Sequence, residues 1–218
     1  MNQRYLLCAA VTCCLASAAA IAQQRRFQPV PPPAPECSAL AAKPIAPAAL
    51  LAELRKGGYV LYFRHTSTDF SLDDTKSRSD DDCENQRPLT DKGRGEARQI
   101  GAVIRELKIP IGLVLASPRC RTMETAMLIF GRVEKASEAR GGPPTADSAE
   151  RYALLRRLLS TPVKPGTNLV ISSHGNPFYA TAGAPYLAEG EAAIVRPLGK
   201  DFEIVARVIH DAWHTLKQ

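Results

Sequence analysis

Residues 59–65, YVLYFRH, decide how this chain folds and where its polar site lies. The unbroken apolar and aromatic run from Tyr59 to Phe63 predicts a strand that is buried on both faces. The run ends directly on Arg64 and His65, a permanent cation beside a titratable imidazole. Parallel sheets covered by helices bind their ligands at the carboxyl ends of their strands. The segment therefore predicts an α/β fold with a functional site just after residue 63.

The rest of the chain repeats this pattern of buried strands separated by helices. Residues 111–118 (IGLVLASP) and 167–174 (TNLVISSH) predict two further buried strands, and residues 192–209 predict two strands joined around Gly199 and Lys200. Strands separated by helices form parallel sheets. We therefore predict a three-layer α/β/α sandwich with a mostly parallel central sheet and an antiparallel C-terminal edge hairpin. The segments with helical patterns are 51–58, 89–110 with Thr90 as N-cap, 121–131 and 148–159.

The first residues predict an export signal. After Arg4 an uncharged apolar run extends to Ile21, and Ala20 and Ala22 provide the small residues that a signal peptidase requires. Residues 1–22 are therefore predicted to be a cleaved signal peptide, and the protein to be periplasmic or secreted without stable membrane association after cleavage. The alternative is an uncleaved membrane anchor, since the run is nearly long enough to span a bilayer.

Composition separates a tether from one folded domain. Residues 23–49 are rich in proline and alanine, which predicts an extended tether, and residues 50–218 form the predicted domain. The formal net charge is +6, but the lysines and arginines are spread along the chain. This spacing argues against nucleic-acid binding and suits a small acidic substrate.

The ends of the three predicted parallel strands bring positive charge to one edge of the sheet. They read FRHTS (63–67), ASPRCRT (116–122) and SSHGN (172–176). Arg64, His65, His174 and either Arg119 or Arg121 should therefore meet in one crevice. Such a cluster requires an anion, and phosphate fits best because guanidinium groups match its oxygens in pairs.

These motifs resemble the histidine phosphatase superfamily, which has the phosphoglycerate mutase-like fold, from about Leu50 to Val208. FRHT takes the place of that family's Arg-His-Gly motif, with Thr66 instead of glycine, and ASPRCRTMETA (116–126) matches its second motif. The third motif is present as Ser173-His174-Gly175. The short spacing between the second and third motifs most resembles the small phosphohistidine-phosphatase-like branch.

The resemblance implies a role for each motif residue. His65 would attack phosphorus and become phosphohistidine, while Arg64, Arg121 and His174 would hold the transferring oxygens, with no metal and no cofactor. The implied function is an exported phosphatase that hydrolyses a phosphomonoester on a small substrate or on a phosphorylated envelope component. The alternatives are a catalytically idle anion-binding module of the same fold and a phosphoglycerate mutase-type isomerase.

The sequence does not identify the general acid of this reaction. Glu138, Asp147 and Glu150 lie in the interval where related enzymes carry one, but Glu150 is explained better as a carboxylate in the first turn of a helix. Glu189 and Glu191 are further candidates, and both also suit an ordinary turn before a strand.

Three polar features have structural interpretations that we prefer to functional ones. The acidic segment 69–84 is predicted to be a solvated rim of the pocket, since it lacks the ligand spacing of a calcium loop. Arg87 is predicted to form a salt bridge with this segment, the alternative being a phosphate contact. His210 and His214 have metal-ligand spacing, but we predict a solvated C-terminal helix face with Trp213 packed inward.

Three cysteines, Cys37, Cys83 and Cys120, follow the predicted signal peptide. An oxidising compartment favours one disulfide and one leftover thiol. Because Cys37 lies in the predicted tether, we favour a Cys83–Cys120 pair, the alternative being free buried thiols.

Overall fold

The structure, a computed structural model, describes residues 45–143 and 145–218. The predicted signal peptide and most of the predicted tether lie outside these residues. Helix α2 (Pro47–Lys56) begins within the end of the predicted tether, so the folded domain starts slightly earlier than Leu50. Pro47 suits this start, because proline at the first helical position loses no backbone hydrogen bond. Among the described residues, no helix is long and apolar enough to cross a membrane.

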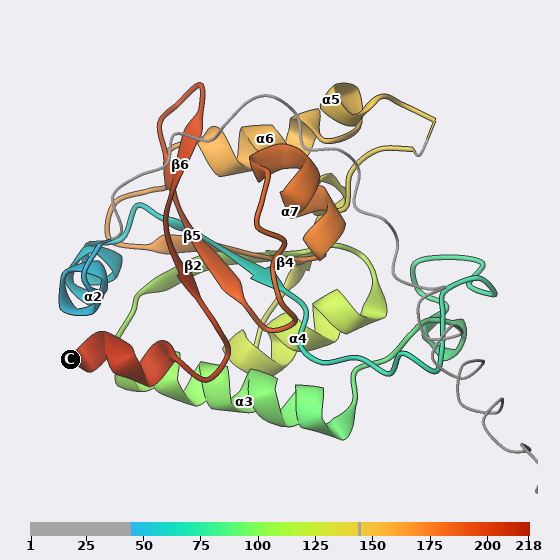
Figure 1. Cartoon of the computed structure of the whole chain (residues 1–218), viewed down its shortest axis with the longest axis horizontal. Coiled ribbons are helices and arrows are strands. Elements are labelled where there is room, and N and C mark those ends of the chain that lie inside the picture. Colours follow the sequence, from blue (N-terminus) through green and yellow to red (C-terminus); the bar gives the residue numbers. More distant parts are fainter. Residues whose placement is uncertain (1–44, 144) are drawn as a thin grey trace, which may run out of the picture. The chain divides into compact units, whose positions relative to one another are not determined.

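A sheet forms the centre of the domain, with helices on both sides (Figure 1). It has six strands in the order β3-β2-β4-β1-β5-β6. The pairs β3–β2, β2–β4 and β4–β1 are parallel, whereas β5 and β6 extend the sheet in antiparallel fashion. This confirms the mostly parallel sheet and the C-terminal edge hairpin. The two-residue strand β3 was not predicted. The strands are β1 (Val60–Arg64), β2 (Ile111–Ala116), β3 (Glu134–Lys135), β4 (Asn168–Ser173), β5 (Ala192–Pro197) and β6 (Phe202–Val208).

Most helices lie where the sequence predicts them. Thr90 caps α3 by accepting a hydrogen bond from the Gly93 amide at 3.0 Å, as predicted. The single helix predicted over 148–159 is divided at Tyr152, and the C-terminal segment forms a 3₁₀ helix, η4. The remaining helices are η2 (Cys83–Asn85), α3 (Asp91–Glu106), α4 (Cys120–Phe130), η3 (Ser137–Ala139), α5 (Ser148–Arg151), α6 (Ala153–Ser160), α7 (Gly175–Ala182) and η4 (Trp213–Lys217).

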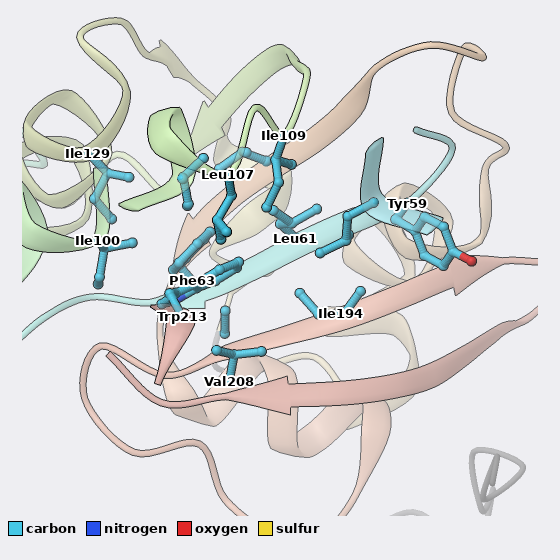
Figure 2. Packing of buried hydrophobic residues seen from close by; sticks show 14 of the residues in the cluster. Tyr59, Leu61, Phe63, Ile100, Leu107, Ile109, Ile129, Ile194, Val208 and Trp213 are labelled. Carbon is cyan, nitrogen blue, oxygen red and sulfur yellow. The ribbon is translucent and has the colours of Figure 1, made fainter. Parts of the chain in front are cut away.

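Two hydrophobic clusters, one on each face of the sheet, confirm the three-layer sandwich. Helices α2, α3, α4 and η4 pack on one face, and α6 and α7 pack on the other. Successive side chains of a strand point to opposite faces, so Leu61 and Phe63 belong to the first cluster and Val60 and Tyr62 to the second. Figure 2 shows the first cluster, in which Trp213 stacks on Phe63 with ring centroids 5.7 Å apart. The unbroken apolar run of β1 is therefore explained by burial on both faces.

Candidate active site

The carboxyl ends of β1, β2 and β4 meet at one edge of the sheet, as predicted. In the parallel register Arg64 lies opposite Ser173, and Ala116 lies opposite Ser172. The ladder continues beyond the strands, since the His65 amide donates to the Ser173 carbonyl at 3.0 Å. The residues that follow each strand are thereby held together by backbone hydrogen bonds.

The His65 imidazole is buried and has a defined orientation. Its side chain is 2% exposed, and Nδ1 lies 3.0 Å from the carbonyl oxygen of Thr66. Because a carbonyl can only accept, we assign the ring proton to Nδ1. The lone pair of Nε2 is then free to act as a nucleophile.

His174 lies beside His65, with the two ring centroids 5.6 Å apart. Its Nε2 is 2.9 Å from the hydroxyl oxygen of Ser117, and its backbone carbonyl accepts a hydrogen bond from Tyr62 at 2.8 Å. Ser117 is a site residue that the sequence analysis did not single out. Its position directly after β2, within the ASPRCRT segment, was the available signal.

Three arginines near the imidazoles carry unpaired polar atoms. The Nε atoms of Arg64, Arg87 and Arg121 are buried and have no hydrogen-bond partner within residues 45–143 and 145–218. A buried donor without a partner is costly, and an anion can satisfy several such donors at once. Arg119, the alternative to Arg121, instead contacts Ser77 at 2.9 Å and lies 3.7 Å from Asp80.

The salt bridge predicted between the Arg87 side chain and the acidic segment is absent from the described residues. The Arg87 guanidinium lies over the ring of Phe70, an aromatic residue of this segment, 4.5 Å from its centroid, and the Arg87 backbone amide donates to Asp74. The prediction was wrong because the aromatic face of Phe70 offers the cation a favourable contact that sequence spacing does not reveal.

Burial lowers the pKa of His65 and of His174 well below the ordinary 6.5, and the charge of Arg121 lowers both further. For His65, Arg64 and Arg87 act in the same direction. An imidazole in this position stays neutral at physiological pH, which is the protonation state that a nucleophile needs.

We expect both imidazoles to titrate below pH 6.5 in the folded protein. As the pH falls below 6.5, the unfolded chain takes up protons on both imidazoles while the folded protein does not. The two groups therefore lower the free energy of unfolding as the pH falls from 6.5 to their lowered folded pKa. Imidazole NMR resonances, assigned with His65→Gln and His174→Gln, would measure the midpoints. A midpoint at or above 6.5 for either ring would contradict the expectation.

The carboxylate of Asp74 binds Arg121 through both oxygens. Oδ1 lies 3.0 Å from Nη1 and Oδ2 lies 2.9 Å from Nη2, while Oδ1 also accepts from the Arg87 amide at 2.8 Å. Partial burial opposes ionisation, but these contacts outweigh it and hold the pKa of Asp74 below 3.8. Asp74 therefore binds the guanidinium in the paired manner that a phosphate would use.

Replacing Asp74 by asparagine is expected to tighten the binding of inorganic phosphate about 10-fold, because Arg121 would no longer have to release a charged partner. Isothermal titration calorimetry would measure the dissociation constant. Asp73→Asn is the matched control, since Asp73 is exposed and, among the residues that the structure describes, accepts from Thr75 alone. Equal affinities in the two variants would contradict the prediction.

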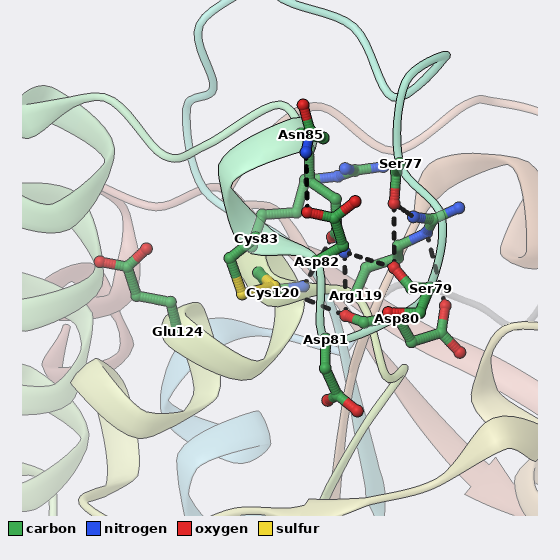
Figure 3. The surroundings of a disulfide bond; sticks show 12 residues. Ser77, Ser79, Asp80, Asp81, Asp82, Cys83, Asn85, Arg119, Cys120 and Glu124 are labelled. Carbon is green, nitrogen blue, oxygen red and sulfur yellow. Dashed lines mark hydrogen bonds and ion pairs between the residues drawn. A yellow bond between two sulfur atoms is a disulfide. The ribbon is translucent and has the colours of Figure 1, made fainter.

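Most residues of the acidic segment 69–84 are exposed, as predicted for a solvated rim, and two further carboxylates of the segment pair with cations of the surrounding domain. Asp80 pairs with Arg140 at 2.5 Å, and Asp81 pairs with Lys135 at 2.5 Å. The predicted disulfide between Cys83 and Cys120 is confirmed (Figure 3). The disulfide joins the segment to the first residue of α4, directly before Arg121.

Thr66 takes the glycine position of the first motif without backbone strain. Lys108 is the only non-glycine residue with positive φ in the described part of the chain, so Thr66 has a conformation open to any residue. Its amide lies 3.3 Å from the Thr125 hydroxyl, and its side chain is fully buried. A Cβ at Gly175 would lie 2.3 Å from the Tyr186 ring, so a larger residue there would require the Tyr186 side chain to move.

Among the candidate acids, Glu189 is the one that reaches His65. Glu150 is exposed in the first turn of α5, where its amide donates to Asp147, and Glu138 is exposed elsewhere on the domain. Glu191 binds Arg207 at 2.7 Å. Glu189 lies 3.8 Å from Nδ1 of His65 and 3.5 Å from Arg64.

His210 and His214 do not belong to a cluster of potential metal ligands. Among the described residues, no group of three or more His, Cys, Asp or Glu side chains could hold a metal ion. His214 is exposed, and Nε2 of His210 lies 3.9 Å from Glu96. Trp213 between them is 1% exposed and packs inward, as predicted.

Comparison with known proteins agrees with this fold and with the motifs. The family model of the histidine phosphatase superfamily (branch 1) matches residues 60–142, which include His65 and Arg121. No curated protein matches the chain in sequence. Over residues 60–142, therefore, the chain is similar to the histidine phosphatase superfamily.

Solved structures with the same fold include several phosphatases. YhfR of Bacillus stearothermophilus shares 14% identity over 68% of this chain and 95% of that chain, with a TM-score of 0.50. A phosphoserine phosphatase mutant from Entamoeba histolytica, in complex with phosphoserine, shares 13% identity over 71% of this chain and 98% of that one, with a TM-score of 0.50. A mycobacterial glucosyl-3-phosphoglycerate phosphatase shares 14% identity over 68% and 97%, with a TM-score of 0.50. At these identities the likeness concerns the fold alone.

Proposed function

We propose that this protein is an exported phosphatase that hydrolyses a phosphomonoester through a phosphohistidine intermediate on His65. The observation that carries the proposal is the buried, neutral imidazole, with the Nε2 lone pair free, among three guanidinium groups whose Nε atoms lack partners in the described part of the chain. The superfamily match supports phosphatase chemistry.

In the first step, Nε2 of His65 attacks phosphorus. The Nε2–P bond forms while the bond from phosphorus to the leaving oxygen breaks, and that oxygen takes up a proton. Arg64, Arg87 and Arg121 are suited to bind the phosphoryl oxygens, and His174 borders the same space. Fixed cations that need no reorganisation during the reaction stabilise the charge on those oxygens.

In the second step, water attacks the phosphohistidine. A P–O bond forms, the P–Nε2 bond breaks, and the water proton leaves with the products, so His65 returns to its neutral form. The Thr66 carbonyl holds the proton on Nδ1 throughout, which keeps Nε2 as the reacting nitrogen. Asp74 must leave Arg121 before this guanidinium can bind substrate.

A small phosphorylated molecule or a phosphorylated envelope component is the proposed substrate. A cavity of about 540 Å³ is lined by Arg87 and Arg121, by apolar residues such as Pro88, Pro118 and Met123, and by acidic side chains, and it lies beside the arginines with neither imidazole in its lining. A cavity of this size has room for the organic part of a small phosphoester. The Cys83–Cys120 disulfide supports export, because disulfides persist in oxidising compartments.

Turnover of a panel of phosphomonoesters and phosphoanhydrides would test the proposal, with phosphate release measured for the full chain expressed with its own N-terminal segment. We expect release from at least one phosphomonoester. Phosphate binding without any turnover would favour the idle anion-binding module. Interconversion of phosphoglycerates without phosphate release would favour the isomerase.

A further inference from the structure

We propose that Glu189 is a positioning residue for His65, whose carboxylate compensates the positive charge that the imidazole acquires when Nε2 bonds to phosphorus. This inference rests on the proposed phosphohistidine chemistry. Glu189 lies on the loop before β5, outside the three sequence motifs.

Direct contacts hold the Glu189 carboxylate next to the imidazole. Oε1 lies 3.8 Å from Nδ1 of His65. The same oxygen accepts a hydrogen bond from the Thr68 hydroxyl at 2.6 Å, and Oε2 accepts one from the Thr68 amide at 3.3 Å. Thr68 belongs to the segment that follows β1, so the carboxylate is bound to the same piece of chain that carries the nucleophile.

The backbone of the Glu189 loop is fixed to the end of β1. The Gly190 amide donates to the His65 carbonyl at 2.9 Å, and the Arg64 amide donates to the Glu191 carbonyl at 3.0 Å. Gly190 has a φ of +73°, and a Cβ at this position would lie 3.0 Å from Cβ of His210, so the turn requires glycine. The position of Glu189 relative to His65 is therefore set by the backbone as well as by the side chain.

The surroundings of His65 explain why a carboxylate is needed there. Arg121, Arg64 and Arg87 all disfavour positive charge on the ring. Bond formation at Nε2, with the proton kept on Nδ1, makes the ring formally cationic. Among the described residues, Glu189 is the only carboxylate within 4.0 Å of a His65 ring nitrogen. Asp74 is bound to Arg121 and does not take this place.

The same geometry argues against Glu189 as the proton donor to the leaving group. In-line displacement places the leaving oxygen on the far side of phosphorus from Nε2. The Glu189 carboxylate lies on the Nδ1 side of the ring. Its proposed effect is therefore electrostatic and positional.

Glu189→Gln tests the charge while keeping an oxygen that can accept from Thr68. We expect kcat and the single-turnover rate of His65 phosphorylation to fall about 10- to 100-fold, with KM changed less than about threefold. Thr68→Val, which removes the hydroxyl donor but keeps the shape, is expected to give a smaller fall in kcat. Glu203→Gln is the matched control, because Glu203 pairs with Arg196 on the edge hairpin, and its kcat should equal that of the wild type.

Several outcomes would overturn the inference. One is a Glu189→Gln protein with wild-type kcat, and another is a change confined to KM, which would indicate a substrate contact. Melting temperatures would identify a merely structural role. If kcat falls only because both Glu189→Gln and Thr68→Val have lost folded protein, that result also counts against the inference. A wild-type protein that turns over substrate without labelling His65 would refute the proposed mechanism itself, and this inference with it.

Discussion

His65→Ala is expected to lower phosphate release at least about 1,000-fold and to abolish the acid-labile phosphate that the wild-type protein should carry after brief incubation with labelled substrate. The side chain is buried among three guanidinium groups, and the Thr66 carbonyl fixes its Nδ1. Rapid alkaline quench, which preserves phosphohistidine, followed by counting of protein-bound label, gives the measurement.

His214→Ala is the matched control for this experiment, because His214 is exposed and lies on η4. It should keep the label and the turnover of the wild-type protein. Label that persists in His65→Ala would show that another residue is phosphorylated. Thermal melting of both variants would establish that the loss of activity is not a loss of folded protein.

Removal of the Cys83–Cys120 disulfide is expected to lower the free energy of unfolding by about 3 to 4 kcal/mol. The cross-link joins residues 37 positions apart, and a cross-link of this length restricts the unfolded chain by about that amount of free energy. Urea unfolding of the double variant Cys83→Ala/Cys120→Ala, compared with the wild type, would measure the difference.

Reductant provides the control for the disulfide experiment. It should lower the urea midpoint of the wild-type protein and leave that of the double variant unchanged. A wild-type midpoint that does not respond to complete reduction, verified by alkylation of Cys83 and Cys120, would contradict the predicted stabilisation.

The patterns that the sequence predicted well are local ones. The run from Tyr59 to Phe63 required burial on both faces, and the two core clusters provide it. The helical period after Thr90, with its capping hydroxyl, predicted α3. Such patterns arise from backbone periodicity and from the hydrogen bonds of neighbouring residues, which a short window of sequence contains.

The convergence of His65, Arg121 and His174 was also predictable, although these residues are far apart in the sequence. Parallel strands joined by crossover helices place all their carboxyl ends at one edge, so the topology alone brings these positions together. The topology does not predict the positions of the loop side chains. The break of the predicted helix at Tyr152 and the short strand β3 likewise depend on tertiary contacts that override local preference.

By itself, therefore, the sequence determined the layers of the fold, the edge at which the site lies and the residues that follow the three parallel strands. Only the tertiary structure decided which loop carboxylates reach that site. Asp74 binds Arg121 across 47 positions, and Glu189 binds Thr68 across 121. Arg87 lies over Phe70 instead of pairing with an acid. These contacts form where long loops pack against the sheet. The positions of such loops depend on the packing of the whole domain, which no local periodicity encodes.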